Sequence, residues 1–189
     1  MNTQHQNNNG FIPANSGFRN LKSYQKAEII YDGTVYFTKR FFDKYDRTVG
    51  QMVQAARSGK QNIAEGSVFS ATSKETEIKL TNVARASLVE LQIDYEDFLR
   101  INKLQRWGIN HPYSKRMKEL NSIPNATYAT YAKGIENDDP EICANVMIGL
   151  ICVTVYLLNN QIKALEQAFL KEGGLRESMT RARLNSRRR

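Results

Sequence analysis

The chain has few of the residues that build metal sites and disulfide frameworks. It contains two cysteines and two histidines, and because His5 and His111 lie far apart, no metal-ligating cluster is visible. Cys143 and Cys152 are nine positions apart, which on a helix places them on opposite sides and about 13.5 Å apart along the axis. They cannot form a disulfide within such a helix, so we expect free, buried and reduced thiols.

Long hydrophobic runs are also missing. The N-terminal ten residues are rich in Asn and Gln and lack the apolar segment of a secretory signal, and we predict a flexible arm over 1–19. The most apolar run, Met147–Leu158, is shorter than the ~20 residues that cross a bilayer. We therefore predict a buried helix, no membrane association and a cytoplasmic location.

Positive charge is what the chain has in excess. It carries 27 Lys and Arg against 19 Asp and Glu, a formal net charge of +8. The segment 39–60 has a net charge of +4 and the segment 171–189 one of +5, so the remainder is nearly balanced. A protein of this charge favours polyanions, whether nucleic acid, anionic lipid or an acidic protein face.

Helical periodicity runs through the chain, and no segment alternates as a strand does. The first helix is expected to begin after Asn20, which can serve as its N-cap. Glu28 interrupts its mostly apolar stripe, and Gly33 weakens its middle. The predicted stripe consists of Leu21, Tyr24, Glu28, Tyr31, Val35, Thr38 and Phe42.

Two further helices follow in the first half of the chain. One is expected over about 49–66, with Gly66 as its C-cap. Thr72 with Glu75 fits a capping box that opens the next helix. Its apolar residues recur with the spacing of a helical-bundle seam, and they are Ala84, Leu88, Leu91, Tyr95 and Phe98.

Glycine and proline interrupt the pattern between Gln105 and Asp138, where we predict an insertion with short helices over about 113–120 and 126–134. Asp139-Pro140-Glu141 then reads as the start of a fourth long helix that ends before Gly173-Gly174. Its apolar residues wrap most of its circumference, so we expect a homo-oligomer.

The predicted fold is therefore all-α. It is an antiparallel up-and-down four-helix bundle over 20–172, with a helical insertion over 105–138 between helices three and four. A basic C-terminal extension covers 173–189. Trp107 is expected to anchor the insertion to the bundle.

The segment Asn62-Ile63-Ala64-Glu65-Gly66 is the most distinctive motif. Asn62 and Glu65 are three residues apart and share a helix face, where they could form a functional pair or satisfy buried donors. We favour the structural interpretation, and we attribute Gly59 and Gly66 to close helix approach and capping. The sequence 57–60 lacks the residue order of a phosphate-binding loop.

This motif, together with Phe41-Phe42, the segment 55–58 and the segment 84–91, resembles the signature of a bacterial four-helix bundle family. That family comprises proteins encoded in intervening sequences of ribosomal RNA genes, and the basic extension is similar to the C-terminal suffix of one branch. The family is similar in turn to the accessory variability protein of diversity-generating retroelements. The resemblance implies an oligomeric, pentameric scaffold that associates with nucleic acid and with a reverse transcriptase.

Two sets of cations are the candidate phosphate contacts. The first surrounds the corner between the first two helices and consists of Lys39, Arg40, Lys44, Arg47, Arg57 and Lys60. The second is the C-terminal set Arg176, Arg181, Arg183, Arg187, Arg188 and Arg189. The alternatives are a solvated charged face for the first set, and for the second a disordered tail or one that docks on an acidic protein face.

The sequence predicts a non-catalytic protein without cofactor or metal that binds RNA or structured DNA by charge and shape. The alternative is a protein–protein interaction scaffold with no nucleic-acid role. The best acidic candidates for catalysis, Asp94, Glu96 and Asp97, have no recognisable histidine partner. Tyr128 and Tyr131 in the insertion are plausible contact residues.

Overall fold

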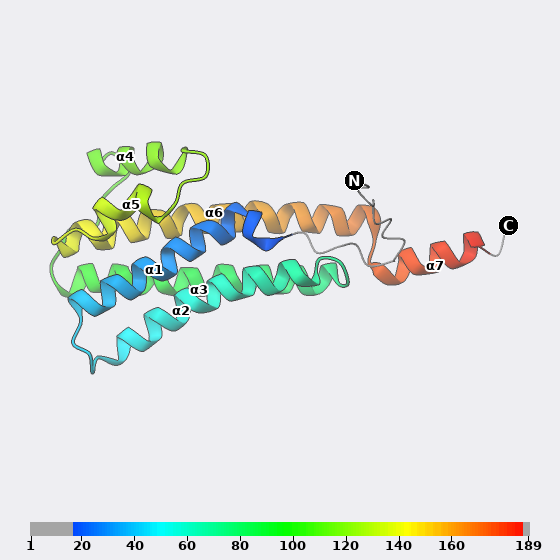
Figure 1. Ribbon diagram of the computed structural model, residues 1–189, viewed down its shortest axis with the longest axis horizontal. Helices are drawn as coiled ribbons and strands as arrows, with labels where there is room; N and C mark the ends of the chain where they lie inside the picture. The colour runs from blue at the N-terminus through cyan, green and yellow to red at the C-terminus, as the bar shows by residue number, and fades with distance from the viewer. Residues whose placement is uncertain (1–16, 187–189) are drawn as a thin grey trace, which may run out of the picture.

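The protein is all-α over the part that its computed structural model describes, residues 17–186 with the side chains of 172, 175, 176, 178, 182 and 186 excepted. No strand occurs among these residues (Figure 1). Residues 1–16 of the predicted arm and the arginines 187–189 lie outside this description. The elements are a 3-10 helix Phe18–Asn20, α1 Lys22–Phe41, α2 Arg47–Phe69, α3 Lys74–Ile101, α4 Pro112–Asn121, α5 Tyr128–Ile135, α6 Pro140–Glu172 and α7 Leu175–Ser186.

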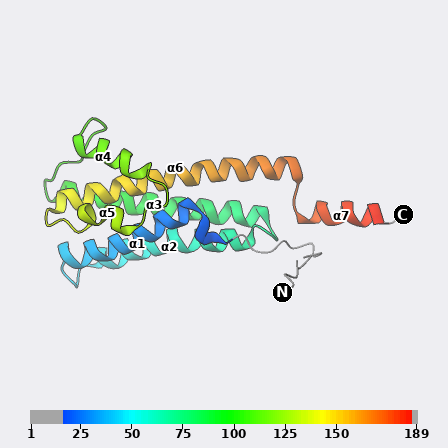
Figure 2. The ribbon, with the colours of Figure 1, turned by 45° about the horizontal axis from the view of Figure 1, so that its top comes forward.

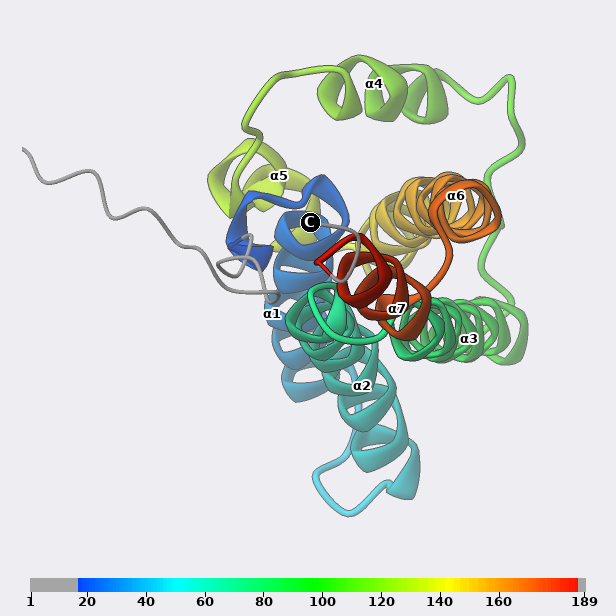
Figure 3. The ribbon, with the colours of Figure 1, turned by 90° about the vertical axis from the view of Figure 1, so that its right-hand side faces the viewer.

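Four long helices lie side by side around one core. Helix α1 packs against α2 and α6, and α3 packs against the same two helices (Figure 3). The short helices α4 and α5 of the predicted insertion contact α6, and α5 also contacts α1. Helix α7 extends past the ends of the long helices, on the side opposite α4 and α5 (Figures 1 and 2).

The core follows the predicted seam of α3. Ala84, Leu88, Leu91 and Tyr95 have no exposed surface, and Phe98 is almost as deeply buried. An aromatic cluster closes one end of this core, where the ring of Phe37 lies 4.8 Å from those of both Tyr95 and Phe98. This burial removes a continuous apolar surface from water, which is the main favourable contribution to folding.

The apolar stripe predicted for the first helix is wrong by part of a turn. Its members are half-buried or exposed except Thr38, and the fully buried positions include Ala27, Ile30 and Phe37. Gly33 lies on the buried side, where an added Cβ would come within 2.7 Å of the Met147 sulfur. The absence of a side chain at Gly33 therefore lets α1 approach α6 closely.

Three predicted helix ends also differ from the structure. Leu21, not Asn20, precedes α1, and Ser73, not Thr72, caps α3 by accepting a hydrogen bond from the Thr76 amide. Helix α2 continues past Gly66 to Phe69. An added Cβ at Gly66 would meet the Glu77 carbonyl and Leu80 at 3.4 Å, so this glycine allows α2 and α3 to pack closely and does not form a cap.

Helix α6 begins and ends as predicted. The Asp139 side chain accepts a hydrogen bond from the Glu141 amide, Pro140 occupies the first turn, and Gly173 stops the helix with a φ of 72°. By length and composition, Pro140–Lys171 could cross a membrane, and it is the one such helix among the described residues. Within the protein, 56% of its most apolar window is buried, as in a core helix.

The insertion covers much of the apolar circumference of α6. Val146, Met147, Ile148, Leu150 and Ile151 are all buried within one chain, because α1, α3, α4 and α5 all pack against this part of the helix. The wide apolar face therefore does not by itself require a second subunit. Both cysteines lie on α6 and are free, but the prediction that both are buried holds only for Cys143, since Cys152 is exposed.

Candidate nucleic-acid interface

The corner between α1 and α2 brings together four of the six predicted cations. Lys39 and Arg40 end α1, Lys44 lies in the loop, and Arg47 begins α2; all four are exposed. The loop is fixed by Asp46, whose carboxylate accepts a hydrogen bond from the Thr48 amide at 2.8 Å. Hydrogen bonds from Thr48, first from its side chain and then from its amide, lower the pKa of Asp46, which favours the ionised carboxylate that caps α2.

The other two cations lie farther along α2. Lys60 is 13 residues beyond Arg47, about 20 Å along the helix axis. Its ammonium lies 4.2 Å from the centre of the Tyr31 ring, and Lys44 makes a similar contact of 4.8 Å with Tyr45. The six cations are thus spread over the corner and along α2, and they do not form one compact patch.

An acidic groove opens at the same corner. Its volume is about 450 Å³, and the acidic residues that line it are Asp43, Asp46, Asp94 and Asp97. Burial, and after it the negative charges of Glu90 and Asp97, raise the pKa of Asp94. Arg40 is partly neutralised as well, because it forms an ion pair with Asp138. The corner therefore carries both signs of charge.

The outward face of α2 keeps a single sign of charge. Its exposed side chains between Asp46 and Glu65 include Arg47, Gln54, Arg57 and Gln61, and no acidic residue occurs between these limits. Arginine and glutamine side chains both donate hydrogen bonds to phosphate oxygens. Arg47 and Arg57 on this face are therefore the members of the first predicted set that are best placed to contact a polyanion.

The second set lies on α7 and beyond it. Arg181 and Arg183 are exposed, Arg176 lies in the first turn of the helix, and residues 187–189, the remaining predicted arginines, fall outside the described residues. Glu177 accepts a hydrogen bond from the Gly174 amide at 2.8 Å, which helps to start α7 after the glycine pair. Met179 and Leu184 on α7 are also exposed, at 46% and 53%.

The Asn62 motif joins α2 to α3. The Asn62 amide donates to the Ser58 carbonyl at 2.9 Å and to the Ser58 hydroxyl at 3.1 Å, and that hydroxyl lies 2.9 Å from the Ser87 hydroxyl of α3. Glu65 is exposed. Asn62 and Gly66 thus both lie in the contact between α2 and α3, although Gly66 does not form the predicted cap, and Glu65 lies outside that contact.

Two of the three acidic candidates for catalysis are bound by neighbouring side chains. Glu96 accepts hydrogen bonds from Gln92 and Arg106, and Asp97 pairs with Arg100 at 2.7 Å. In residues 17–186 no group of three or more His, Cys, Asp or Glu side chains is arranged to hold a metal ion. Glu96 belongs to a network of hydrogen bonds that fixes the chain after α3.

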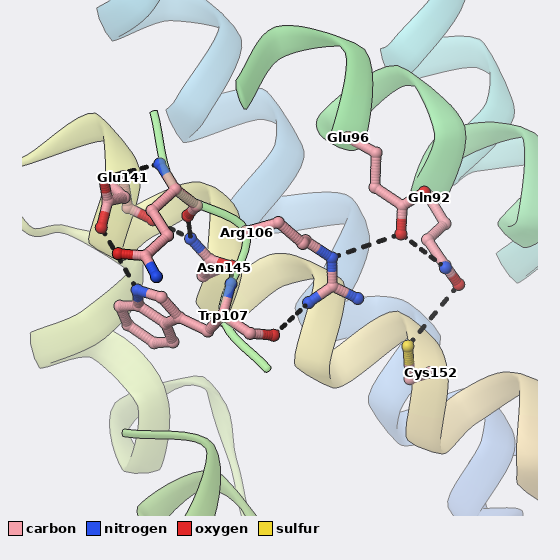
Figure 4. A network of polar contacts seen from close by, with 8 residues as sticks. Gln92, Glu96, Arg106, Trp107, Glu141, Asn145 and Cys152 are labelled. Carbon is pink, nitrogen blue, oxygen red and sulfur yellow. Dashed lines mark hydrogen bonds and ion pairs between the residues drawn. The ribbon is translucent and has the colours of Figure 1, made fainter. Parts of the chain in front are cut away.

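That network places Trp107 against α6, as predicted (Figure 4). The Trp107 amide donates to the Asn145 side chain at 2.8 Å, and its indole N–H donates to Glu141 at 3.3 Å. Asn145 donates in turn to the Gln105 carbonyl at 2.8 Å. Sequence reasoning missed Asn145, because a lone Asn in the most apolar helix gives no periodic signal.

Sequence reasoning also missed Lys26 of α1. Its side chain is buried, and its ammonium donates hydrogen bonds to Asn121 at 2.9 Å and to the Tyr131 hydroxyl at 3.0 Å. The sequence predicts Tyr131 as a plausible contact residue for bases, but only 2% of it is exposed. Trp107 thus attaches the start of the insertion to α6, and Lys26 attaches its middle to α1.

No protein-family model, curated protein or solved structure matches this chain. The residues and their geometry therefore carry any assignment of function.

Proposed function

We propose that the protein is a non-catalytic scaffold that binds RNA or structured DNA through its positive surface and tail. One observation carries the proposal: α7 projects past the long helices and exposes Arg181 and Arg183 (Figure 2). Arginine matches phosphate geometry with paired N–H donors. A helix that stands clear of the rest of the protein can lie along a polyanion without steric hindrance.

The outward face of α2 supplies the second contact surface in this proposal. Arg47 and Arg57 lie about 15 Å apart along its axis, a separation that spans several phosphates of a nucleic-acid backbone. Such contacts fix affinity and orientation and carry little base sequence information. We therefore propose binding by charge and shape.

The arrangement of the long helices belongs to the same proposal. We assign α1, α2, α3 and α6 to an antiparallel up-and-down four-helix bundle; the packing of each against two of the others supports this assignment. Such a body would hold α2 and α7 in fixed relation to each other. Membership of the family of intervening-sequence proteins stays a prediction.

We also propose a homo-oligomer, with the pentamer as the predicted size. Support comes from exposed apolar residues at the far end of α6, where Phe169 is 37% and Leu170 84% exposed, and from Met179 and Leu184 on α7. A reverse transcriptase as partner and a cytoplasmic location are further predictions.

A protein–protein scaffold is the alternative function. The exposed Met179 and Leu184 lie on the same short helix as Arg181 and Arg183, a combination that suits an acidic amphipathic helix of another protein. In that case the tail would bind a partner protein and would not bind nucleic acid.

Fluorescence anisotropy with labelled single-stranded and duplex RNA at low salt separates the two functions. We expect the full chain to bind, and a chain that ends at Gly174 to bind at least about tenfold more weakly, because six arginines are removed. The variant Arg181→Gln/Arg183→Gln should lose more affinity than the matched control Lys115→Gln/Lys118→Gln, which removes the same charge from α4.

Two results decide against parts of this proposal. Absence of binding to any nucleic acid at low salt would remove the function. An unchanged affinity for the chain that ends at Gly174 would remove α7 from the interface and leave only the α2 face.

A further inference from the structure

A groove lies between the insertion and α6, away from the surfaces proposed to bind nucleic acid. Its volume is about 390 Å³, and its walls come from α4, α5, α6 and the segment before α4. Met117, Ile142 and Val146 supply aliphatic surface to it. Grooves of about 300–1,000 Å³ with mostly apolar walls are typical of small-molecule sites.

One wall of the groove is aromatic and held in place. The ring of Trp107 lies 5.0 Å from that of Tyr113 and stacks on that of His111 at 4.7 Å. Trp107 is only 6% exposed, and its backbone and indole N–H groups are bound by Asn145 and Glu141 (Figure 4). Tyr113 is 53% exposed, so an aromatic face is preformed at the edge of the groove.

The charged residues on the groove wall are all positive. Arg116 and Lys133 line it, and no Asp or Glu does. Arg116 forms an ion pair with Glu119 at 2.7 Å. Lys133 is exposed and forms no ion pair within residues 17–186, so its ammonium is available to a ligand.

The neutral polar groups of the groove also favour an anion. The side-chain oxygen of Asn137 already accepts a hydrogen bond from the Asp139 amide at 2.9 Å, so its side-chain NH₂ group remains as a donor. The Thr130 oxygen likewise accepts from the Thr127 amide at 3.1 Å, which leaves its O–H as a donor. Ammonium, amide and hydroxyl donors beside an apolar wall complement a negatively charged group.

We infer that this groove binds a small organic anion, with a ring-containing apolar body and a carboxylate, phosphate or sulfonate group. The body lies against Trp107, Tyr113 and Met117, and the anionic group meets Lys133 and Asn137. This inference does not depend on the nucleic-acid function, because the groove shares no residue with α2 or α7.

The test uses 8-anilinonaphthalene-1-sulfonate, an aromatic anion, as the probe. Trp107 is the only tryptophan, so energy transfer from it reports dye bound to this protein, and paired variants then assign that binding to the groove. We expect Lys133→Glu to weaken this binding about tenfold, because a charge-assisted contact becomes a repulsion. Lys118→Glu is the matched control: it makes the same charge change on α4, outside the groove.

Two further arms separate the parts of the ligand. Tyr113→Ala should reduce transfer by removing the aromatic edge, and inorganic phosphate should compete only weakly because it has no apolar body. Thioflavin T, an aromatic cation, should show little transfer from Trp107. Circular dichroism of each variant verifies the fold, and Lys133→Gln replaces Lys133→Glu if that variant loses helix.

Equal dye affinity of Lys133→Glu and Lys118→Glu would overturn the inference, and so would equal transfer to the cationic and anionic dyes. Nucleic-acid binding should be the same in these two variants, since both lose the same charge. A failure of anion binding in the groove can therefore be distinguished from a failure of the proposed nucleic-acid binding.

Discussion

The ammonium of Lys26 on α1 donates a hydrogen bond of 3.0 Å to the Tyr131 hydroxyl on α5 in the interior of the protein. A second bond, of 2.9 Å, reaches Asn121 at the end of α4. In residues 17–186 no carboxylate pairs with this lysine, and burial followed by the charge of Lys22 lowers its pKa. Neutral oxygen atoms thus solvate a buried cation and fix the insertion to the long helices.

Tyr131→Phe tests this contact. The change leaves the Lys26 ammonium with one acceptor fewer in a buried site, so we expect a loss of about 1–3 kcal/mol in the free energy of unfolding, measured with urea. Tyr113→Phe is the control, because Tyr113 is exposed and its loss should stay within about 0.5 kcal/mol. Equal losses in the two variants would show that Lys26 does not depend on Tyr131.

Two glycines of α2 should respond to alanine with opposite signs. An added Cβ at Gly59 would lie 2.7 Å from a terminal methyl of the fully buried Leu88, whereas at Gly50 nothing lies within 4 Å. We expect Gly50→Ala to stabilise the protein by about 1 kcal/mol through helix propensity. Gly59→Ala should destabilise it by about 1 kcal/mol, since overpacking exceeds that gain. Thermal unfolding of the pair measures this, and stabilisation by both would refute close helix contact at Gly59.

Asn145→Ala should loosen the attachment of the insertion at Trp107. The change leaves the Trp107 amide and the Gln105 carbonyl without their side-chain partner, and we expect a loss of about 2–3 kcal/mol. Urea unfolding followed by Trp107 fluorescence reports this directly. Asn160→Ala on the exposed side of α6 is the control, and the account is contradicted if both variants unfold at the same urea concentration as the unmodified protein.

Stability should fall between pH 8.5 and 10 because of Cys143. Burial raises the pKa of its thiol from 9.0 to about 12. Between these values the unfolded state has lost a proton that the folded state keeps, so the free energy of unfolding decreases as pH rises. We expect a decrease of about 1 kcal/mol from this thiol over the interval. In Cys143→Ala, the decrease in the free energy of unfolding over this interval should be smaller by about 1 kcal/mol. If stability falls in parallel with pH in the two proteins, the Cys143 thiol is not the cause.

The helices could be predicted where a single pattern decided them. Heptad spacing located the buried side of α3, and Asp139-Pro140-Glu141 located the start of α6, because in each case local residues and tertiary packing favour the same structure. In α1 these two influences diverge. Its buried face combines Ile30 and Phe37 with the smaller Ala27, Gly33 and Thr34, and large apolar residues also occur on the neighbouring face, so side-chain size alone does not identify the core face.

The candidate sites depended on contacts between distant parts of the chain. Lys26 and Asn121 are separated by 95 residues, and no periodicity predicts that they meet. The charge count likewise predicted a basic corner, but not that Asp94 and Asp97 of α3 would line a groove beside it. The basic extension after α6 was predictable, since the glycine pair and the local charge are both features of the sequence.

The salt dependence of RNA binding tests the central claim most directly. The logarithm of the association constant for a duplex should fall linearly with the logarithm of the salt concentration, and its slope should become shallower by up to about 5 when the chain ends at Gly174, because six arginines leave the interface. The same slope for both chains, or no binding by either at low salt, would contradict the account.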